Sequence, residues 1–330
     1  MTLLLSRPAI AALMGPADYL EAVEAGFRAA AAGKASAPPP LSLPGTLGTF
    51  HAKGASLDLG RPCSALKLNG NFPGNPPALP TIQGAVLLCD GRDGRLLAVM
   101  DSIEITLRRT AAATALAARS LARPQSRTLL VCGCGAQARA QLEALLEILP
   151  LRRCFAWDRD HGRAEAFALE AHGLEAEAVR GISGVSTECD VIVTCTTARE
   201  PFLAAAQIAP GTFVAAVGAD SPEKNEIDPG LMAGARVVPD ILGQCLEMGD
   251  LRHAVRAGVM RESDIHAELG AIVSGSAPGR TDDDQIFVFD STGTALQDVA
   301  AAAAIYERAC CRGGAPSFDF AGTVTGDSHQ

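Results

Sequence analysis

The sequence lacks the basic blocks, and the aromatic residues interleaved with basic ones, that are typical of nucleic-acid-binding proteins. Acidic residues outnumber basic residues by 37 to 28, which gives a formal net charge of -9. We therefore expect no nucleic-acid partner. The sequence also lacks an uncharged run long enough to cross a bilayer, so we expect no membrane partner.

A secretory signal is missing from the first residues. The run MTLLLSRPAIAALMG has no charged segment ahead of its apolar residues, and Arg7 and Pro8 interrupt the apolar stretch. The pattern instead predicts a short helix capped by Ser6. The 10 cysteines form no C-x-x-C pair, and several fall in strands predicted to be buried. We therefore expect buried, reduced thiols, no metal site and a cytoplasmic location.

The length and the order of patterns predict an α/β protein of two domains. A chain of 330 residues exceeds one small core. A helix over 16–33 is followed by sheet-like segments with a hairpin turn from Gly91 to Gly94, and then by a long alanine-rich helix from Thr106 to before Pro124. Strands and helices alternate after it, which implies a parallel sheet covered by helices on both faces.

The end of the chain carries a final alanine-rich helix, ALQDVAAAAAIYERACC, which must pack on another part of the protein, and we expect it to return to the first domain. The residues after it, GGAPSFDFAGTVTGDSHQ, are predicted to form a loose tail.

The stretch from Arg127 to Asp158 has the order strand, glycine turn, helix, strand and acid. Gly133 permits a sharp turn out of the first strand, and Gly135 lets a pyrophosphate approach the backbone at the positive end of the following helix. Ala138 replaces the third glycine of the usual fingerprint. A dinucleotide site is the predicted use of this loop, and an ordinary turn between strand and helix is the alternative.

Asp158 bears on the choice between the two nicotinamide cofactors. Its carboxylate can accept hydrogen bonds from a ribose diol and would repel a 2′-phosphate, so the sequence favours NAD. Arg159, next to it in the chain, keeps NADP open.

Two basic residues stand where apolar residues would be expected. Lys67 lies in the strand SALKLNG, where it either anchors a carboxylate, donates a proton or occupies an exposed strand face. Arg109 is expected in the first turn of the alanine-rich helix, where the helix dipole disfavours a cation unless an anion is near. We expect it to contact a carboxylate or phosphate, and a solvated helix-face arginine is the alternative.

An acid and a further basic pair complete the candidates. Asp220 ends the run VAAVGAD, and parallel sheets bind ligands beyond the carboxyl ends of their strands. Its carboxylate can keep an imine in the protonated form that accepts hydride readily, or it caps the next segment. His51 and Lys53 stand two residues apart in an extended run, so they share one strand face and imply either an anionic partner or an exposed edge.

Several stretches together resemble one family. The segments KLNGNFPGN, LPTIQG, ITLRRTAAATALAARSLA, VCGCGAQA, VGADSPEKNEI and FDSTGTALQDVAAA, in this order and spacing, resemble the ornithine cyclodeaminase/mu-crystallin family over nearly the whole chain. The resemblance implies a Rossmann domain (121–295) inserted into a substrate-binding and dimerisation domain (1–120 plus 296–330). It also implies a homodimer and NAD(P)-dependent chemistry at a carbon that bears an amino or imino group.

The resemblance further implies roles for individual residues. Lys67 and Arg109 would contact the substrate carboxylate and the nicotinamide region, and Asp220 would be the catalytic acid. Beside the two glycines of the loop, the cofactor would be lined by Thr81, Ala136, Gln137, Asp158, Thr196, Lys224 and Ser291.

The chain departs from the cyclising members of that family at positions that bear on the substrate. Those members carry an arginine near the positions of Pro39 and Pro40, an acid at the position of His51 and a methionine at that of Lys53. Loss of the acid removes a partner for a second amino group, and two basic residues are gained. A second carboxylate on the substrate is therefore favoured, as in the iminosuccinate reductases related to this family.

The sequence thus predicts an enzyme that delivers hydride from NADH to a small 2-imino acid and forms the L-amino acid, with iminosuccinate and L-aspartate as the leading pair. Ornithine cyclisation and the reduction of pyrroline-2-carboxylate are alternatives. A mu-crystallin-like protein that binds a nucleotide and a small ligand without turnover is a further alternative.

Overall fold

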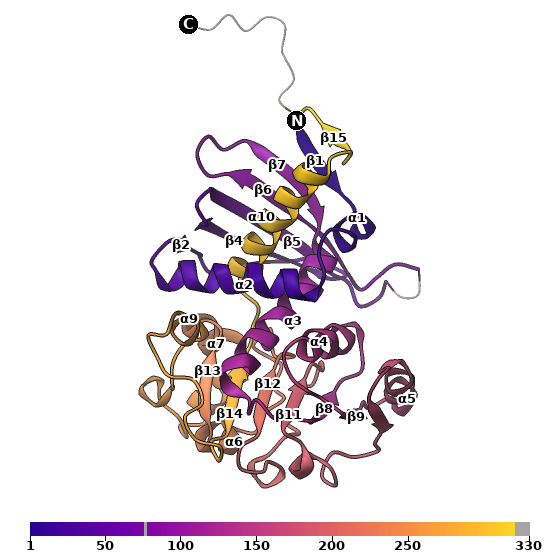
Figure 1. The fold of residues 1–330 in the computed structure, drawn as a ribbon, viewed down its shortest axis with the longest axis vertical. Helices are drawn as coiled ribbons and strands as arrows, with labels where there is room; N and C mark the ends of the chain where they lie inside the picture. The colour runs from indigo at the N-terminus through magenta and orange to yellow at the C-terminus, as the bar shows by residue number, and fades with distance from the viewer. Residues whose placement is uncertain (76–77, 321–330) are drawn as a thin grey trace, which may run out of the picture.

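The computed structural model describes residues 1–75 and 78–320, which form two units, each built on one sheet (Figure 1). The first unit contains β1 (Thr2–Leu5), α1 (Arg7–Ala11), α2 (Pro16–Ala31), β2 (Ala35–Ser36), β3 (Leu41–Pro44), β4 (Thr49–Asp58), β5 (Pro62–Asn71), β6 (Ile82–Asp90), β7 (Leu96–Asp101), α10 (Ala295–Arg312) and β15 (Ser317–Phe318). The helix α3 (Ser102–Leu121) connects it to the second unit.

The second unit follows α3. It contains β8 (Thr128–Cys132), α4 (Ala136–Leu146), β9 (Arg153–Trp157), α5 (His161–Glu170), β10 (Glu175–Ala178), η1 (Ser186–Glu188), β11 (Val191–Thr194), η2 (Ala205–Gln207), β12 (Phe213–Ala216), α6 (Pro229–Gly234), β13 (Arg236–Pro239), α7 (Leu242–Met248), α8 (Asp250–Arg256), η3 (Glu262–Asp264), α9 (Leu269–Ser274) and β14 (Phe287–Asp290). Its strands lie in the order β10-β9-β8-β11-β12-β14-β13, and every pair is parallel.

This parallel sheet confirms the predicted α/β class. The strands β11, β12 and β14 are buried along their whole length, as expected for a sheet with helices on both faces. The chain leaves β8 for β9 on one side and later returns to β11 on the other. The crevice between β8 and β11 is therefore the switch point at which such sheets bind ligands.

The first sheet has the order β15-β1-β7-β6-β5-β4-β2, with β3 paired to β4. The predicted hairpin is confirmed, since β6 and β7 are antiparallel neighbours. The predicted short helix is confirmed as α1, with Ser6 at its N-cap position, although the Ser6 side chain makes no capping bond and β1 precedes the helix. The other end of the chain differs from the prediction. The tail is ordered at Ser317 and Phe318, which pair with β1, and the predicted loose tail beyond residue 320 lies outside the described residues.

The helix α3 begins at Ser102, four residues before the predicted start at Thr106. The Asp101 carboxylate accepts hydrogen bonds from the backbone N–H groups of Ile103 and Glu104 and so caps the helix earlier. Arg109 therefore lies two turns into the helix, and the predicted first-turn position was wrong. The helix dipole does not explain the residue at this depth.

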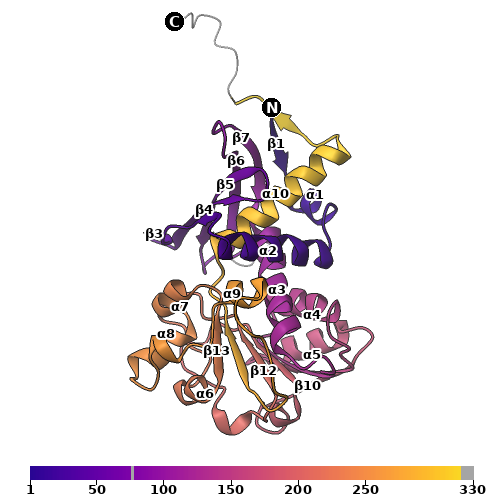
Figure 2. The same ribbon diagram turned by 60° about the vertical axis from the view of Figure 1, so that its left-hand side comes forward.

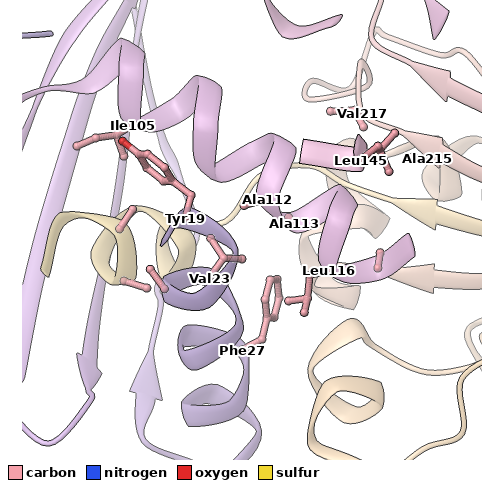
Figure 3. Close-up of a cluster of buried hydrophobic side chains, with 14 of the residues drawn as sticks. Tyr19, Val23, Phe27, Ile105, Ala112, Ala113, Leu116, Leu145, Ala215 and Val217 are labelled. Atoms are coloured by element: carbon pink, nitrogen blue, oxygen red, sulfur yellow. The ribbon is translucent and has the colours of Figure 1, made fainter. Parts of the chain in front are cut away.

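One continuous apolar cluster joins the two units. Figure 3 shows its central part, with side chains from α2, α3, α4 and β12 and the residues that follow β12. The labelled residues include Tyr19, Val23, Phe27, Ile105, Ala112, Leu116, Leu145 and Val217. Because alanines fill much of α3, neighbouring helices approach it closely, and α3 fixes the first unit on the second.

The helix α10 returns from the second unit to the first, as predicted. It packs on β4 and β5, and its residues Leu296, Val299 and Ala300 are buried there. Figure 2 shows α10 and α2 on the same side of the first sheet. The opposite face of that sheet carries exposed leucines, among them Leu66 and Leu87.

Two further predictions concern the burial of the cysteines and the absence of a membrane-spanning helix. All 10 cysteines are free, but Cys310 and Cys311 are exposed near the end of α10, so the expectation of buried thiols fails for these two. Within residues 1–75 and 78–320, no helix combines the length and apolar character that a bilayer span requires.

Candidate functional site

The carboxyl ends of β8, β9 and β11 surround a cavity of about 630 Å³. Four of the predicted cofactor residues, Gly133, Gly135, Asp158 and Thr196, line it. The cavity thus lies at the switch point of the parallel sheet, and its volume falls in the range of about 300–1,000 Å³ that is typical of small-molecule sites.

The glycine loop has the backbone geometry that a nucleotide site requires. Gly133 has φ +93°, and a Cβ atom there would lie 2.8 Å from the carbonyl oxygen of Cys195. Gly135 precedes α4 as its N-cap, and a Cβ atom there would meet no other atom within 4 Å. Ala136 and Gln137 follow as the first residues of α4. The start of α4 can therefore present free N–H groups to an anion.

Asp158 both lines the cavity and braces the glycine loop. Its Oδ2 accepts a hydrogen bond from the backbone N–H of Cys134 at 2.8 Å, and its Oδ1 accepts one from that of Asp160 at 2.9 Å. The cavity wall also carries Arg159, Arg163 and Arg199. The cavity therefore offers both an acceptor for a ribose diol and guanidinium groups for phosphate oxygens.

Lys67 and Arg109 meet at a carboxylate that the sequence analysis did not identify. Asp298 of α10 lies 2.7 Å from Lys67 Nζ and 3.0 Å from Arg109 Nε. All three side chains are buried, at 4%, 4% and 2% exposure. Gln297 Oε1 accepts a further hydrogen bond from Arg109 at 2.7 Å. Lys67 is thus not on an exposed strand face, and Arg109 is not a solvated surface arginine.

Burial and neighbouring charges shift the pKa values of these groups. Burial lowers the pKa of Lys67 to about 7, although the Asp298 carboxylate acts in the opposite direction. Burial acts to raise the pKa of Asp298, but Lys67 and Arg109 outweigh it and hold that pKa below its ordinary value. The cluster therefore contains one firmly ionised acid and a lysine that titrates near neutral pH.

Lys53 joins the same cluster from β4. It pairs with Lys67 across the strands, and His51 pairs with Asn69, so these side chains share the face that α10 covers. Lys53 Nζ donates to the carbonyl oxygens of Thr292 and Gly293 at 3.3 and 2.8 Å. Burial and then the Arg109 charge lower the pKa of Lys53, while nearby carboxylates oppose the shift.

Asp220 lies after β12 and is solvent-exposed. It forms an ion pair with Lys224, with Oδ1 and Nζ 2.6 Å apart. Its carboxylate is close enough to act on the pKa of Lys53. Asp220 thus lies at the carboxyl edge of the sheet, within electrostatic reach of the cation cluster.

Thr81 and Ser291, two further predicted cofactor residues, also lie in connecting segments. Thr81 precedes β6, and its carbonyl accepts a backbone hydrogen bond from Phe72 at 2.8 Å. Ser291 follows β14, and its hydroxyl donates to Asp240 at 3.4 Å. Their roles remain predictions, because neither lines the cavity beside the glycine loop.

The residues that sequence reasoning missed are Asp298, Gln297, Trp157 and Phe202. The signal for Asp298 was available, because an acid in the first turn of an alanine-rich helix that must pack on another part of the protein needs a cation partner once it is buried. Trp157 and Phe202 line the cavity with ring centroids 5.1 Å apart. Nothing in the local sequence of Phe202 indicates this contact.

Gly133→Ala should weaken binding of NADH by more than about tenfold, because its Cβ atom would displace the carbonyl of Cys195 in the cavity wall. Trp157 is the single tryptophan and lines the cavity, so quenching of its fluorescence reports the binding. Gly258→Ala is the matched control, since Gly258 also has positive φ but open space around it. Equal affinity in both variants would contradict the assignment of the loop.

Lys67→Met should change how stability depends on pH. The pKa of Lys67 lies lower in the folded protein than in an unfolded chain, so the unfolded state binds more protons above pH about 7. The free energy of unfolding of the wild type should therefore rise with pH relative to Lys67→Met, by at most about 1.4 kcal/mol per pH unit. Urea unfolding between about pH 6 and 9 measures this difference.

The exposed Lys34 provides the control for that measurement. Lys34→Met should preserve the pH dependence of the wild type. If the curve of Lys67→Met runs parallel to that of the wild type, Lys67 does not titrate near neutral pH.

The family relationship follows from comparison with known proteins. Residues 2–312 match the model of the ornithine cyclodeaminase/mu-crystallin family. The chain is 38% identical over 311 residues to alanine dehydrogenase of Archaeoglobus fulgidus, an alignment that covers 93% of this chain and 95% of that protein.

Solved structures agree with this relationship. An archaeal alanine dehydrogenase dimer with bound NAD has a TM-score of 0.92 at 37% identity, over 97% of this chain and 99% of that one. Iminosuccinate reductase of Paracoccus denitrificans in complex with NAD⁺ has a TM-score of 0.88 at 33% identity, over 96% and 99% of the two chains. The family predicted from the motifs is thereby confirmed, and the chain belongs to the ornithine cyclodeaminase/mu-crystallin family.

Proposed function

We propose that the protein is an NAD-dependent imine reductase that converts a small 2-imino acid to the L-amino acid. Three features support this proposal: the cavity at the glycine loop, the buried cations of the first unit and the exposed acid Asp220. Similar proteins include an alanine dehydrogenase with bound NAD and an iminosuccinate reductase in complex with NAD⁺.

The leading substrate is a dicarboxylic imino acid, iminosuccinate, with L-aspartate as the product. The observation that carries this choice is the charge of the cluster. Lys53, Lys67 and Arg109 lie together, yet among residues 1–75 and 78–320 only Asp298 contacts any of them as a side-chain anion. A cluster of basic side chains of this kind is stabilised by an anionic ligand, and a dicarboxylate supplies two charges.

Each side chain of the site has a separate role in the proposed reaction. Gly133, Gly135, Asp158 and Thr196 would hold NADH, which when bound would supply the hydride that turns the C=N double bond into a C–N single bond. Lys67 and Arg109 hold the α-carboxylate, and His51 and Lys53 hold the distal one. Asp220 keeps the imine nitrogen protonated, because an iminium ion accepts hydride far better than a neutral imine.

A second candidate is the reduction of 2-iminopropanoate to alanine. It is favoured by the similarity to alanine dehydrogenase of Archaeoglobus fulgidus, at 38% identity over 93% of this chain. This substrate has one carboxylate, so it needs Lys67 and Arg109 but neither His51 nor Lys53.

The two candidates differ in a simple rate measurement. NADH oxidation with oxaloacetate plus ammonia should be faster than with pyruvate plus ammonia. His51→Ala combined with Lys53→Met should raise the KM for the dicarboxylate by about tenfold or more and leave the monocarboxylate nearly unchanged, because only the distal carboxylate loses its charged partners. Equal effects on both substrates would rule out the distal role of His51 and Lys53.

The same assay separates the remaining candidate functions. A preference for pyruvate supports the alanine reaction, and turnover of pyrroline-2-carboxylate alone supports a cyclic imine. Conversion of ornithine without net consumption of NADH indicates a cyclodeaminase. Binding of NADH with no turnover of any of these compounds indicates a mu-crystallin-like binding protein.

We further propose a homodimer, formed by the sheet face of the first unit that lies opposite α10. Leu66 pairs with Leu87, Leu87 with Val99, and Val99 with Leu4, so an apolar row crosses the sheet on this face. Leu66 is 47% exposed. Exposed apolar patches of this kind mark protein interfaces. In this arrangement, residues 1–120 with 296–330 provide substrate binding and dimerisation, and residues 121–295 bind NAD.

Leu66→Glu should convert the dimer to a monomer, because a desolvated carboxylate within the apolar row is unfavourable. Light scattering during gel filtration measures the mass. Leu169→Glu is the matched control, since Leu169 is also exposed, at 79%, but lies on α5 of the other unit. A wild-type monomer, or a dimer that Leu66→Glu leaves intact, contradicts this interface.

A further inference from the structure

One buried side chain, Glu226, ties together the carboxyl ends of β11 and β12. Its Oε1 accepts a hydrogen bond from the backbone N–H of Thr196 at 2.6 Å. Its Oε2 accepts one from the backbone N–H of Gly218 at 2.8 Å and one from the Thr194 hydroxyl at 2.7 Å. Glu226 is completely buried and does not line the cofactor cavity. Its carboxylate therefore holds the segments after β11 and β12 through hydrogen bonds and does not contact a ligand in that cavity.

Both loops lead directly to groups of the proposed site. Thr196 lines the cofactor cavity. Gly218 precedes Asp220 by two residues, and the backbone N–H of Asp220 donates to the Gly218 carbonyl at 3.1 Å. A Cβ atom on Gly218 would lie 2.4 Å from Glu226 Oε1, so only glycine permits this approach. The position of the Glu226 carboxylate thus sets the distance between Thr196 in the cavity wall and the segment that carries Asp220.

The backbone of Glu226 is itself held firmly. Asp250 Oδ1 accepts the backbone N–H groups of Glu226 and Ile227 at 2.7 and 3.0 Å. The Glu226 carbonyl accepts backbone hydrogen bonds from Phe202 and Leu203 at 3.0 and 3.2 Å. Because the residue is anchored at its backbone, its carboxylate is a fixed point to which the loops after β11 and β12 attach.

We propose that Glu226 is a positioning residue that sets Asp220 against the nicotinamide end of the cofactor. It is the last residue of the GAD-x-x-x-K-x-E element, which spans 218–226 within the segment VGADSPEKNEI. This inference rests on the proposed imine reduction. It gives the glutamate of that element a task distinct from those of Asp220, the acid, and Lys224, its ion-pair partner. Misplacement of a reacting group by about 1 Å costs on the order of 100-fold in rate.

Glu226→Gln tests the proposal. Each carboxylate oxygen accepts a backbone N–H, so a carboxamide always turns its NH₂ group toward one of these donors. We expect kcat for imine reduction to fall by about 100-fold, with the KM for the imino acid changed by less than about threefold, because the groups that hold the carboxylates are untouched. Thr194→Val, which removes one hydroxyl donor at nearly constant volume, should lower kcat by a smaller factor.

Asp190→Asn is the matched control. Asp190 Oδ2 accepts the backbone N–H groups of Arg127 and Thr128 at 2.7 and 3.0 Å, at the opposite, amino edge of the same sheet. It should lower the melting temperature as Glu226→Gln does but keep kcat within about twofold. If kcat in Glu226→Gln and Thr194→Val equals that of Asp190→Asn, Glu226 is merely structural and the proposal fails. If Glu226→Gln does not fold, the comparison of kcat between Thr194→Val and Asp190→Asn decides between the two roles.

Failure of the proposed function gives a different result. In that case the wild type itself oxidises no NADH with any imino acid. Quenching of Trp157 by NADH then remains as the test, since Thr196 lines the same cavity as Trp157. Glu226→Gln should raise the Kd for NADH several-fold over that of Asp190→Asn, and identical Kd values overturn the positioning role.

Discussion

The proposed substrate site depends on the ion pairs of one buried carboxylate, Asp298. It lies between Lys67 of β5 and Arg109 of α3, and it comes from α10. A buried charge that loses its partner destabilises a protein by several kcal/mol, so each of these three side chains depends on the other two. Because α10 follows the second unit in the sequence, the site is complete only when the end of the chain packs on the first unit.

The contacts of Lys53 extend this arrangement to the cofactor side. Its ammonium group is held by the carbonyls of Thr292 and Gly293, directly after β14, while its own strand belongs to the first sheet. Asp220 and Thr196 also follow strands of the second sheet at the same edge. The cation cluster of one unit therefore faces the carboxyl edge of the other, which is where a hydride donor and an imine have to meet.

The features that could be predicted from the sequence are those encoded locally. The glycine loop and Asp158 lie within a single segment, so their order alone indicated a nucleotide site, and the structure brings them to one cavity. The alternation of strands and helices likewise indicated the parallel sheet. The insertion of one unit into the other was an expectation that came only from the resemblance to the family.

The features that were missed depend on long-range contacts. Arg109 and its partner Asp298 are 189 residues apart, so no local pattern connects them. An anion was expected near Arg109 because a cation in the first turn of a helix opposes the helix dipole. Asp101 caps α3 four residues earlier, so Arg109 is not in the first turn and this reason does not apply. The anion is nevertheless present, as the carboxylate of Asp298 on α10. Glu226 lay in a recognised motif, yet its task became visible only when two separate loops were seen to meet on it.

Isothermal titration calorimetry of the NAD⁺-saturated protein, with L-aspartate and with L-alanine, tests most directly whether the buried cations form a site for two carboxylates. We predict that L-aspartate binds at least about tenfold more tightly than L-alanine, because only aspartate places a second carboxylate beside His51 and Lys53. Equal affinities, or tighter binding of L-alanine, would contradict a site for two carboxylates. Lys53 would then serve only to hold the two units together through its hydrogen bonds to Thr292 and Gly293.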